Sequence, residues 1–200
     1  MAASTPEKLS EIHRQTRETD IRLAFKIGGS GQAQIATGVP FMDHMLTLFA
    51  VHGFFDLTVN ATGDTEVDDH HSVEDLGICL GQALKQALGD GGGIRRYGHF
   101  ALPMDETLVR VTLDLSNRPY LHYGVTLPDQ KVGNFDTALA QEFLRAFSLH
   151  GGITLHVELI HGNNSHHILE AIFKCLAKAL DQACTAEPRS QGVLSSKGAL

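Results

Sequence analysis

The sequence predicts an α+β protein made of two similar halves, each with a mostly antiparallel sheet and two helices, with the helices packed between the sheets. Two observations support this prediction. The eighteen residues from His70, HHSVEDLGICLGQALKQA, align without gaps with HHILEAIFKCLAKALDQA from His166, and nine positions are identical. Segments with strand and helix patterns precede both copies in the same order. A repeat of this kind indicates one structural unit that occurs twice.

The first half begins with two strand-like segments, residues 20–27 and 32–39, around a Gly-Gly-Ser-Gly sequence. Glycine-rich turns between such segments favour a β-hairpin, so we expect these two strands to pair. An apolar-periodic helix that ends at His52-Gly53 follows, then a strand over residues 55–63. The helix that starts at His70 completes the unit.

The second half repeats this order. Residues 106–116 and 120–127 predict a second hairpin, which turns at Ser116 to Pro119. A helix ends at His150-Gly151, and a strand over 153–162 leads to the helix that begins at His166. The glycine run at 89–93 is the natural joint. We therefore divide one compact unit into a first half, residues 1–92, and a second half, residues 93–200.

Composition and charge exclude several classes of protein. A net charge of −7 without a basic stripe argues against nucleic acid as a partner. The longest apolar stretches fall short of the roughly 18 residues that cross a membrane, and the N-terminus lacks the apolar core of a secretory signal. Three cysteines without a CxxC pair indicate reduced thiols in a cytoplasmic protein.

Histidine carries the functional signal, since the chain has twelve. Residues four apart lie on one face of a helix, so His70 with Glu74 and His166 with Glu170 each form a two-ligand pair. The neighbouring His71 and His167 point about 100° away and can reach a second ion across an interface. Six histidines show no local pattern and are expected to be ordinary surface or packed side chains: His13, His52, His99, His122, His156 and His161. The repeat selects a further one, His44, as follows.

Upstream of the two strands the repeat has an offset of 98 (150 − 52), which sets His44 opposite Glu142. Symmetry then divides eight side chains between two ions. The first site comprises His44, His71, His166 and Glu170; the second comprises His70, Glu74, Glu142 and His167. Imidazole and carboxylate ligands without thiolate suit Mn²⁺, Fe²⁺ or Co²⁺, and four protein ligands leave positions open for a substrate.

Three functions are compatible with two such metal sites. A di-metal hydrolase would use the same ligands with a bridging hydroxide. A metal-storage or structural metal protein would bind the ions without turnover. The third function follows from a family resemblance, which rests on the following segments.

Six segments carry a family resemblance: GVPFMDHMLTLFAVHGFFDL, ATGD with DDHHSVED, GIRRYGHFALPMDE, DLSNRPYL, NSHHILEAIFK and SSKGAL. Together, from about Arg14 to Leu200, they resemble imidazoleglycerol-phosphate dehydratases. The resemblance implies a dehydration in histidine biosynthesis, a duplicated fold similar to ribosomal protein S5 domain 2, and two Mn²⁺ per subunit. It also implies an assembly of 24 identical subunits with sites between them. In many members a histidine replaces Glu142, and a glycine often replaces Asn117; asparagine tolerates the positive φ of a turn.

The resemblance also implies the remaining site residues. Glu18 matches the family's acid/base and substrate-binding glutamate. The positions matched to substrate binding, through phosphate above all, are Arg96, Arg118, Lys174, Ser196 and Lys197. The last two lie in a tail that we expect to order when ligand binds. Asp105 and Glu106 are candidates for orienting the metal-bound histidines.

The resemblance implies a substrate in which a dihydroxylated carbon chain joins an imidazole ring to a phosphate. The C–H bond that must break is not adjacent to a carbonyl, so ordinary enolate chemistry is not available. Divalent ions can hold the imidazole ring as imidazolate, which then expels the adjacent hydroxyl and gives a diazafulvene-like intermediate. Loss of a proton yields an enol and then the ketone. The residues expected to take part directly are Glu18, His70, His71, Glu74, His166, His167 and Glu170.

Overall fold

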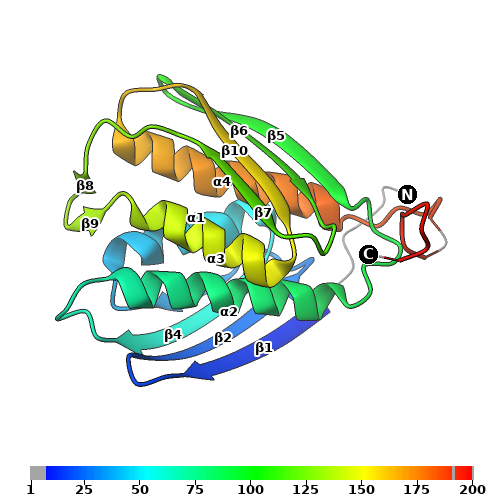
Figure 1. Cartoon of the computed structure of the whole chain (residues 1–200), viewed down its shortest axis with the longest axis horizontal. Coiled ribbons are helices and arrows are strands. Elements are labelled where there is room, and N and C mark those ends of the chain that lie inside the picture. Colours follow the sequence, from blue (N-terminus) through cyan, green and yellow to red (C-terminus); the bar gives the residue numbers. More distant parts are fainter. Residues whose placement is uncertain (1–7, 191, 200) are drawn as a thin grey trace.

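Two four-stranded sheets form the outer layers of the molecule, and four helices lie between them (Figure 1). The structure is a computed structural model that describes residues 8–190 and 192–199. The first sheet has the order β1 (Lys8–Gln15), β2 (Thr19–Ile27), β4 (Asp56–Gly63), β3 (Ala33–Ala36). The second has the order β5 (Tyr97–Met104), β6 (Thr107–Asp114), β10 (Thr154–His161), β7 (Tyr120–Gly124). The helices are α1 (Pro40–Gly53), α2 (His70–Leu88), α3 (Leu139–Gly151) and α4 (Ser165–Cys184).

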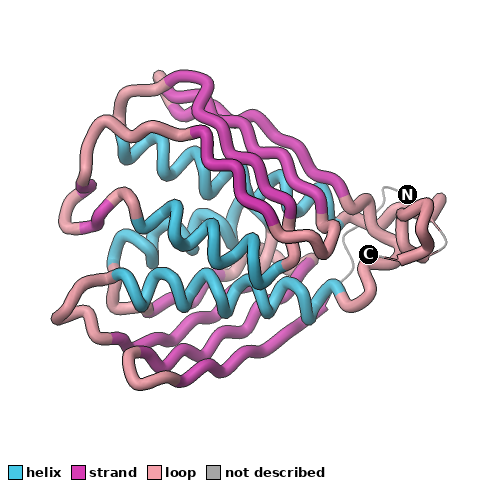
Figure 2. The backbone as a smooth tube through the Cα atoms, viewed as in Figure 1, coloured by secondary structure: helices cyan, strands magenta, loops and turns pink. Residues whose placement is uncertain are grey.

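The two halves have the same topology, which confirms the predicted duplication. In each sheet two neighbouring pairs are antiparallel, and the last pair, β3 with β4 or β7 with β10, is parallel. Helix α2 packs on the first sheet and α4 on the second, whereas α1 contacts α4 and α2 contacts α3. The helices therefore join the halves crosswise. Figure 2 shows the helices as the layer between the two sheets. None of the helices in the described residues is both long and apolar enough to cross a membrane.

The predicted strand pairing was wrong in both halves, because β4 lies between β2 and β3, and β10 lies between β6 and β7. In the first half the cause is local. Asp56, which begins β4, accepts hydrogen bonds from the backbone N–H groups of Ser30 (2.7 Å) and Gln32 (3.1 Å). These bonds fold the glycine loop around the start of β4. The chain then emerges parallel to β4 as β3, rather than beside β2.

The hairpins instead use two strands that the sequence reasoning did not identify. β1 pairs with β2, and β5 pairs with β6, across short turns. One more feature distinguishes the halves: a small ribbon of β8 (Lys131–Val132) and β9 (Phe135–Asp136) precedes α3.

Local hydrogen bonds fix where the two histidine-bearing helices begin. Asn164 caps α4, since its side chain accepts from the backbone N–H groups of His166 (2.9 Å) and His167 (3.2 Å). At the start of α2, Asp68 accepts from the backbone N–H of His70 at 2.8 Å. Side-chain acceptors at these positions satisfy N–H groups that have no partner within a helix. Both histidine pairs consequently occupy the first turn of their helix.

Helices α2 and α3 approach closely because α2 carries glycines where they cross. A Cβ atom at Gly77 would lie 2.5 Å from the carbonyl oxygen of Phe143, and one at Gly81 would lie 2.7 Å from that of Phe147. The repeat places Phe173 and Ala177 at the corresponding positions of α4, at the offset of 96 (173 − 77). Phe173 is buried against Phe143, with ring centroids 5.4 Å apart. Equivalent positions of the two repeat helices thus do different things: Gly77 allows close approach of α3, whereas Phe173 fills the core.

The chain after α4 returns to the joint between the halves. Gly92 forms a β-bridge with Val193, and Ile94 forms one with Ala186. The Arg96 guanidinium then donates to the carbonyl oxygen of Leu194 at 2.6 Å. These contacts hold the tail beside the C-terminal end of α4, at the right of Figure 1.

Candidate metal centre and anion cleft

Three predicted ligands converge between α1 and α4. The ligand atoms of His44, His166 and Glu170 all lie within 4.8 Å of one another, and no other such group occurs among the described residues. Glu170 Oε2 lies 3.3 Å from His44 Nε2 and 3.2 Å from His166 Nε2. One carboxylate oxygen and two imidazole nitrogens around a common point are a suitable donor set for a divalent ion.

The electrostatics of this group favour the ionised carboxylate. Burial raises the pKa of Glu170, but hydrogen bonds from Lys174 and from His44 outweigh that effect, and the pKa lies below its ordinary value. Lys174 Nζ lies 2.5 Å from Glu170 Oε1, so Oε2 remains on the side of the two histidines. An ionised carboxylate is the form that binds a metal. The residues present therefore fit a metal ion.

The pseudo-symmetric group between α2 and α3 is less convergent. His70 Nε2 lies 3.8 Å from Glu74 Oε2, and His70 shares a cleft with Glu142, as the repeat predicts. Glu142, however, accepts a hydrogen bond from Arg145 at 2.8 Å, one turn along α3. This bond draws its carboxylate toward Arg145, whereas His44, its counterpart, contacts Glu170 directly.

His71 and His167 point away from their neighbours, as expected from helix geometry. His70 lies toward Glu74, whereas His71 lies toward Asp64. In the same way His166 lies toward Glu170, whereas His167 lies toward Glu106. Neither His71 nor His167 belongs to a group of ligand atoms within this chain's described residues. In the described residues His71 therefore lies apart from His44, His166 and Glu170, and the four-ligand division stays a prediction.

Each of these outward histidines is held by a carboxylate. His71 Nδ1 lies 2.9 Å from Asp64 Oδ2, and His167 Nδ1 lies 2.8 Å from Glu106 Oε2. An ionised carboxylate only accepts, so Nδ1 donates, and in the neutral ring Nε2 keeps the lone pair that a metal needs. For each histidine this hydrogen bond is the main cause of a raised pKa. The hydrogen bond with His167 in turn is the main cause that lowers the pKa of Glu106 to about 2.

Glu106 was anticipated from the sequence, whereas Asp64 was missed. A signal for Glu106 lies in the repeat, because Glu18-Thr19 and Arg22 recur as Glu106-Thr107 and Arg110, at an offset of 88 (106 − 18). Glu18 Oε2 lies 3.9 Å from His71 Nδ1. The acid/base candidate thus lies beside His71, as its copy Glu106 lies beside His167. Asp105 also approaches its histidine, with Oδ2 3.9 Å from Nε2 of His167.

The predicted phosphate residues gather at the other end of the molecule. Four of the five line one cleft of about 750 Å³ with neighbouring tail residues: Arg96, Arg118, Ser196 and Lys197. The fifth, Lys174, lies beside Glu170 instead. Arg118 is 67% exposed, whereas Arg96 is buried and binds both oxygens of Asp114, at 2.7 and 3.0 Å. Arg96 also adopts a positive φ of 71°.

The cleft and the metal-ligand groups lie at opposite ends of the helices. The histidines occupy the first turns of α2 and α4, whereas Arg96 donates its backbone N–H to Ala183 near the end of α4. From His166 to Cys184, α4 rises about 27 Å at 1.5 Å per residue. Figure 1 shows this separation along the long axis. A small substrate cannot contact both places within one chain.

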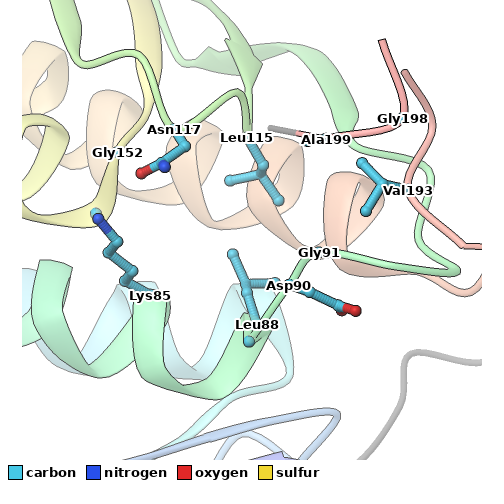
Figure 3. A pocket seen from close by; sticks show the side chains of 12 residues that line it. Lys85, Leu88, Asp90, Gly91, Leu115, Asn117, Gly152, Val193, Gly198 and Ala199 are labelled. Carbon is cyan, nitrogen blue, oxygen red and sulfur yellow. The ribbon is translucent and has the colours of Figure 1, made fainter. Parts of the chain in front are cut away.

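A second cavity, of about 360 Å³, adjoins the tail (Figure 3). It lies between the C-terminal ends of α2 and α3, and Lys85, Leu88, Leu115, Asn117 and Val193 line it with several glycines. Asn117 adopts the positive φ expected of this turn, 52°. None of the predicted site residues lines this cavity.

Together, the fold and the convergent ligands define a duplicated α+β protein with a candidate metal centre. Comparison with known proteins makes the assignment specific. The family model for imidazoleglycerol-phosphate dehydratase matches residues 37–180. The chain therefore belongs to the imidazoleglycerol-phosphate dehydratase family.

Individual relatives agree over nearly the whole chain. The imidazoleglycerol-phosphate dehydratase of Halalkalibacterium halodurans is 59% identical over 189 residues, which cover 94% of this chain and 97% of that protein. The enzyme of Desulfotalea psychrophila is 56% identical over 201 residues, covering 100% of both. The crystal structure from Staphylococcus aureus has 42% identity and a TM-score of 0.82, covering 90% of this chain and 99% of that one. The structure from Pyrococcus furiosus has 38% identity and a TM-score of 0.83, with coverages of 94% and 100%.

Proposed function

We propose that the protein is a hydro-lyase that converts D-erythro-imidazole glycerol phosphate to imidazole acetol phosphate and water, in the cytoplasm, as a step of histidine biosynthesis. Family membership supports this activity. The structural observation that supports this activity is the convergence of His44, His166 and Glu170 on one point. A reaction that must activate an imidazole ring needs such a centre.

The proposed cofactor is two Mn²⁺ per subunit, held by the eight side chains that the sequence repeat divides into two sets. The first set has three members together already, and only His71 must come from elsewhere. In the second set, His70, Glu74 and Glu142 line or adjoin one cleft, and His167 is the missing ligand. Because both missing ligands point outward, a neighbouring subunit is the natural source of each.

In the proposed reaction the chain's own residues bind, orient and transfer protons. When bound, divalent ions act as Lewis acids that favour the deprotonated form of the substrate's ring. Asp64 and Glu106 fix the orientation of His71 and His167 through Nδ1. Expulsion of the hydroxyl next to the ring gives a diazafulvene-like intermediate, loss of a proton gives an enol, and the enol becomes the ketone.

Glu18 is the proposed acid/base that serves the leaving hydroxyl and the proton transfers. Its carboxylate is 55% exposed and lies 3.9 Å from the ring of His71. It therefore lies next to a proposed metal ligand and is open to a substrate. The turn between β1 and β2 brings it there.

Phosphate recognition is proposed for the cleft at the C-terminal end of α4. Arg118 offers an exposed guanidinium, and Ser196 and Lys197 add further donors. Arg96 is fixed by Asp114 and Leu194, so its contribution includes holding the tail in place. Lys174 is proposed to contact substrate from the metal side, since it lies beside Glu170.

The separation of the two ends supports a composite site in which one chain supplies metal ligands and another supplies the phosphate cleft. The proposed state is a homo-oligomer of 24 subunits. Because the α4 helix separates the two ends by about 27 Å, an isolated chain should be inactive.

The deciding experiment incubates the Mn²⁺-loaded protein with imidazoleglycerol phosphate and follows formation of imidazole acetol phosphate. Metal-free protein is the matched control. Release of inorganic phosphate instead would indicate a hydrolase, and metal uptake without turnover would indicate a storage protein. Failure to form the acetol with fully metallated protein would overturn the proposal.

A further inference from the structure

The outer face of the second sheet carries a row of histidines unrelated to the HHxxE helices. The strand register aligns His99 of β5 with Thr112 of β6, Thr112 with His156 of β10, and His156 with His122 of β7. All three histidines are exposed, because alternate residues of these strands point away from the helices. No sequence pattern joins these histidines, because their strands lie far apart along the chain.

Two of these histidines are placed for chelation. The rings of His122 and His156 have centroids 5.3 Å apart, on neighbouring strands. Two imidazoles that bind one tetrahedral ion through nitrogens at about 2.0–2.1 Å place their centroids roughly 5 Å apart. The existing separation therefore needs only side-chain rotation to accept one ion. His99 is separate from this pair, since its Nδ1 lies 3.2 Å from the hydroxyl of Thr112.

Glu158 lies beside this pair, with open space between the side chains. Its oxygens do not converge with the two imidazole nitrogens as the ligand atoms of His44, His166 and Glu170 do, so the side chains must rotate to enclose an ion. Glu158 lies opposite Gly124 in the parallel register, two residues beyond His156. A Cβ atom at Gly124 would lie 3.0 Å from Nε2 of His122 and 3.6 Å from Cγ of Glu158, so the glycine leaves room between these two side chains. The pKa of Glu158 is lowered, mainly by Arg110 and further by His122 and His156, which places both imidazoles in its electrostatic range.

Glu158 also has a free ligand atom. Arg110 donates to Oε2 through Nε (2.8 Å) and Nη2 (2.6 Å), and Oε1 takes no part in these bonds. The carboxylate can therefore turn Oε1 toward the two imidazoles while Arg110 keeps it ionised. Two histidines, one glutamate and a water form a donor set that suits zinc.

We propose that His122, His156 and Glu158 form a third metal site, which binds Zn²⁺ or a similar late divalent ion on the outer face of the second sheet. This site shares no residue with the two Mn²⁺ sites proposed above and is independent of them. The second sheet separates it from the helices, because β6 and β10 lie between the outer face and α4.

The test uses the Mn²⁺-loaded assembly in equilibrium dialysis against Zn²⁺, with both metals measured by elemental analysis. The quantity of interest is Zn²⁺ gained per chain beyond the Mn²⁺ released, which removes exchange at the catalytic sites. The wild-type protein should gain one such ion. His122→Ala and His156→Ala should each abolish the gain, and Glu158→Gln should weaken it about tenfold, as expected for a lost charged ligand.

Two further variants make the test specific. His99→Ala removes an exposed histidine from the same face and should leave the gain unchanged. Arg110→Ala releases Oε2 and should tighten Zn²⁺ binding. Circular dichroism confirms that each variant is folded. An unchanged gain in His122→Ala, or an equal loss in His99→Ala, would overturn the proposal.

Discussion

Asp64 has taken over, in the first half of the chain, the role that Glu106 has in the second. The sequence counterpart of Glu106 is Glu18, yet Asp64 lies 2.9 Å from Nδ1 of His71, while Glu18 stays at 3.9 Å. Glu106 itself binds the corresponding nitrogen of His167 at 2.8 Å. The substitution frees one carboxylate, which supports the acid/base role proposed for Glu18.

Asp64→Asn should lower Mn²⁺ affinity about tenfold or more, because groups that orient metal-bound histidines typically contribute 10–100-fold. Equilibrium dialysis of the folded variant measures this. Glu66→Gln is the matched control, since it removes a charge from the same loop and Glu66 lies outside the contacts of His71. Equal affinities of the two variants would show that Asp64 does not orient a ligand.

Glu142→Ala should reduce the bound Mn²⁺ from two ions per chain to one, because the change removes a ligand from the second set only. Elemental analysis after dialysis gives the ratio. Arg145→Ala should keep both ions, since it only removes the hydrogen bond that now holds the Glu142 carboxylate. Retention of two ions in Glu142→Ala would exclude Glu142 as a required ligand.

The pair of Glu106 and His167 should stabilise the metal-free protein only within a limited pH range. The pKa of Glu106 is lowered from 4.5 to about 2, so its stabilisation is present above pH 4.5 and is lost as the pH falls through 2. The pKa of His167 is raised from 6.5, so its stabilisation is complete below pH 6.5 and is lost at higher pH. The difference in Tm between wild type and Glu106→Gln should therefore be largest at about pH 5.5. A constant difference from pH 4 to pH 9 would contradict this ion pair.

Truncation after Gly192 should raise KM more than about tenfold, since charge-assisted contacts each contribute about 1.5–3 kcal/mol. The truncation removes Ser196 and Lys197 from the cleft and the carbonyl of Leu194 that Arg96 binds. Steady-state kinetics with imidazoleglycerol phosphate measure the effect. Lys197→Ala alone should give a smaller increase. A truncated enzyme with an unchanged KM would show that the tail does not bind substrate.

Complete removal of metal should shrink the particle, because the outward His71 and His167 are proposed to join metal groups of neighbouring chains. Light scattering before and after dialysis against a chelator measures this, and re-addition of Mn²⁺ should restore the original size. A particle of constant size would mean that direct protein contacts suffice for assembly.

The sequence predicted the histidine-bearing helices and the place of His44 correctly. Helical spacing can be recognised within a few residues, and an internal repeat can be recognised by aligning the sequence with itself. The prediction failed for strand order, since the contact of Asp56 with the glycine loop is invisible until the chain folds. The partnership of Asp64 with His71 was missed for a related reason. Asp64 follows a different strand from Glu106, so the repeat does not align them.

The glycines of α2 and the phenylalanine of α4 record how far the two copies have diverged. A chain assembled from two first halves would have Gly77 where Phe173 now fills the core, and would contain a void. One assembled from two second halves would drive a benzyl side chain into the carbonyl oxygen of residue 143, which lies 2.5 Å from the first carbon. Each copy of the helix is therefore fitted to its own position, and the two copies are no longer interchangeable despite their common pattern.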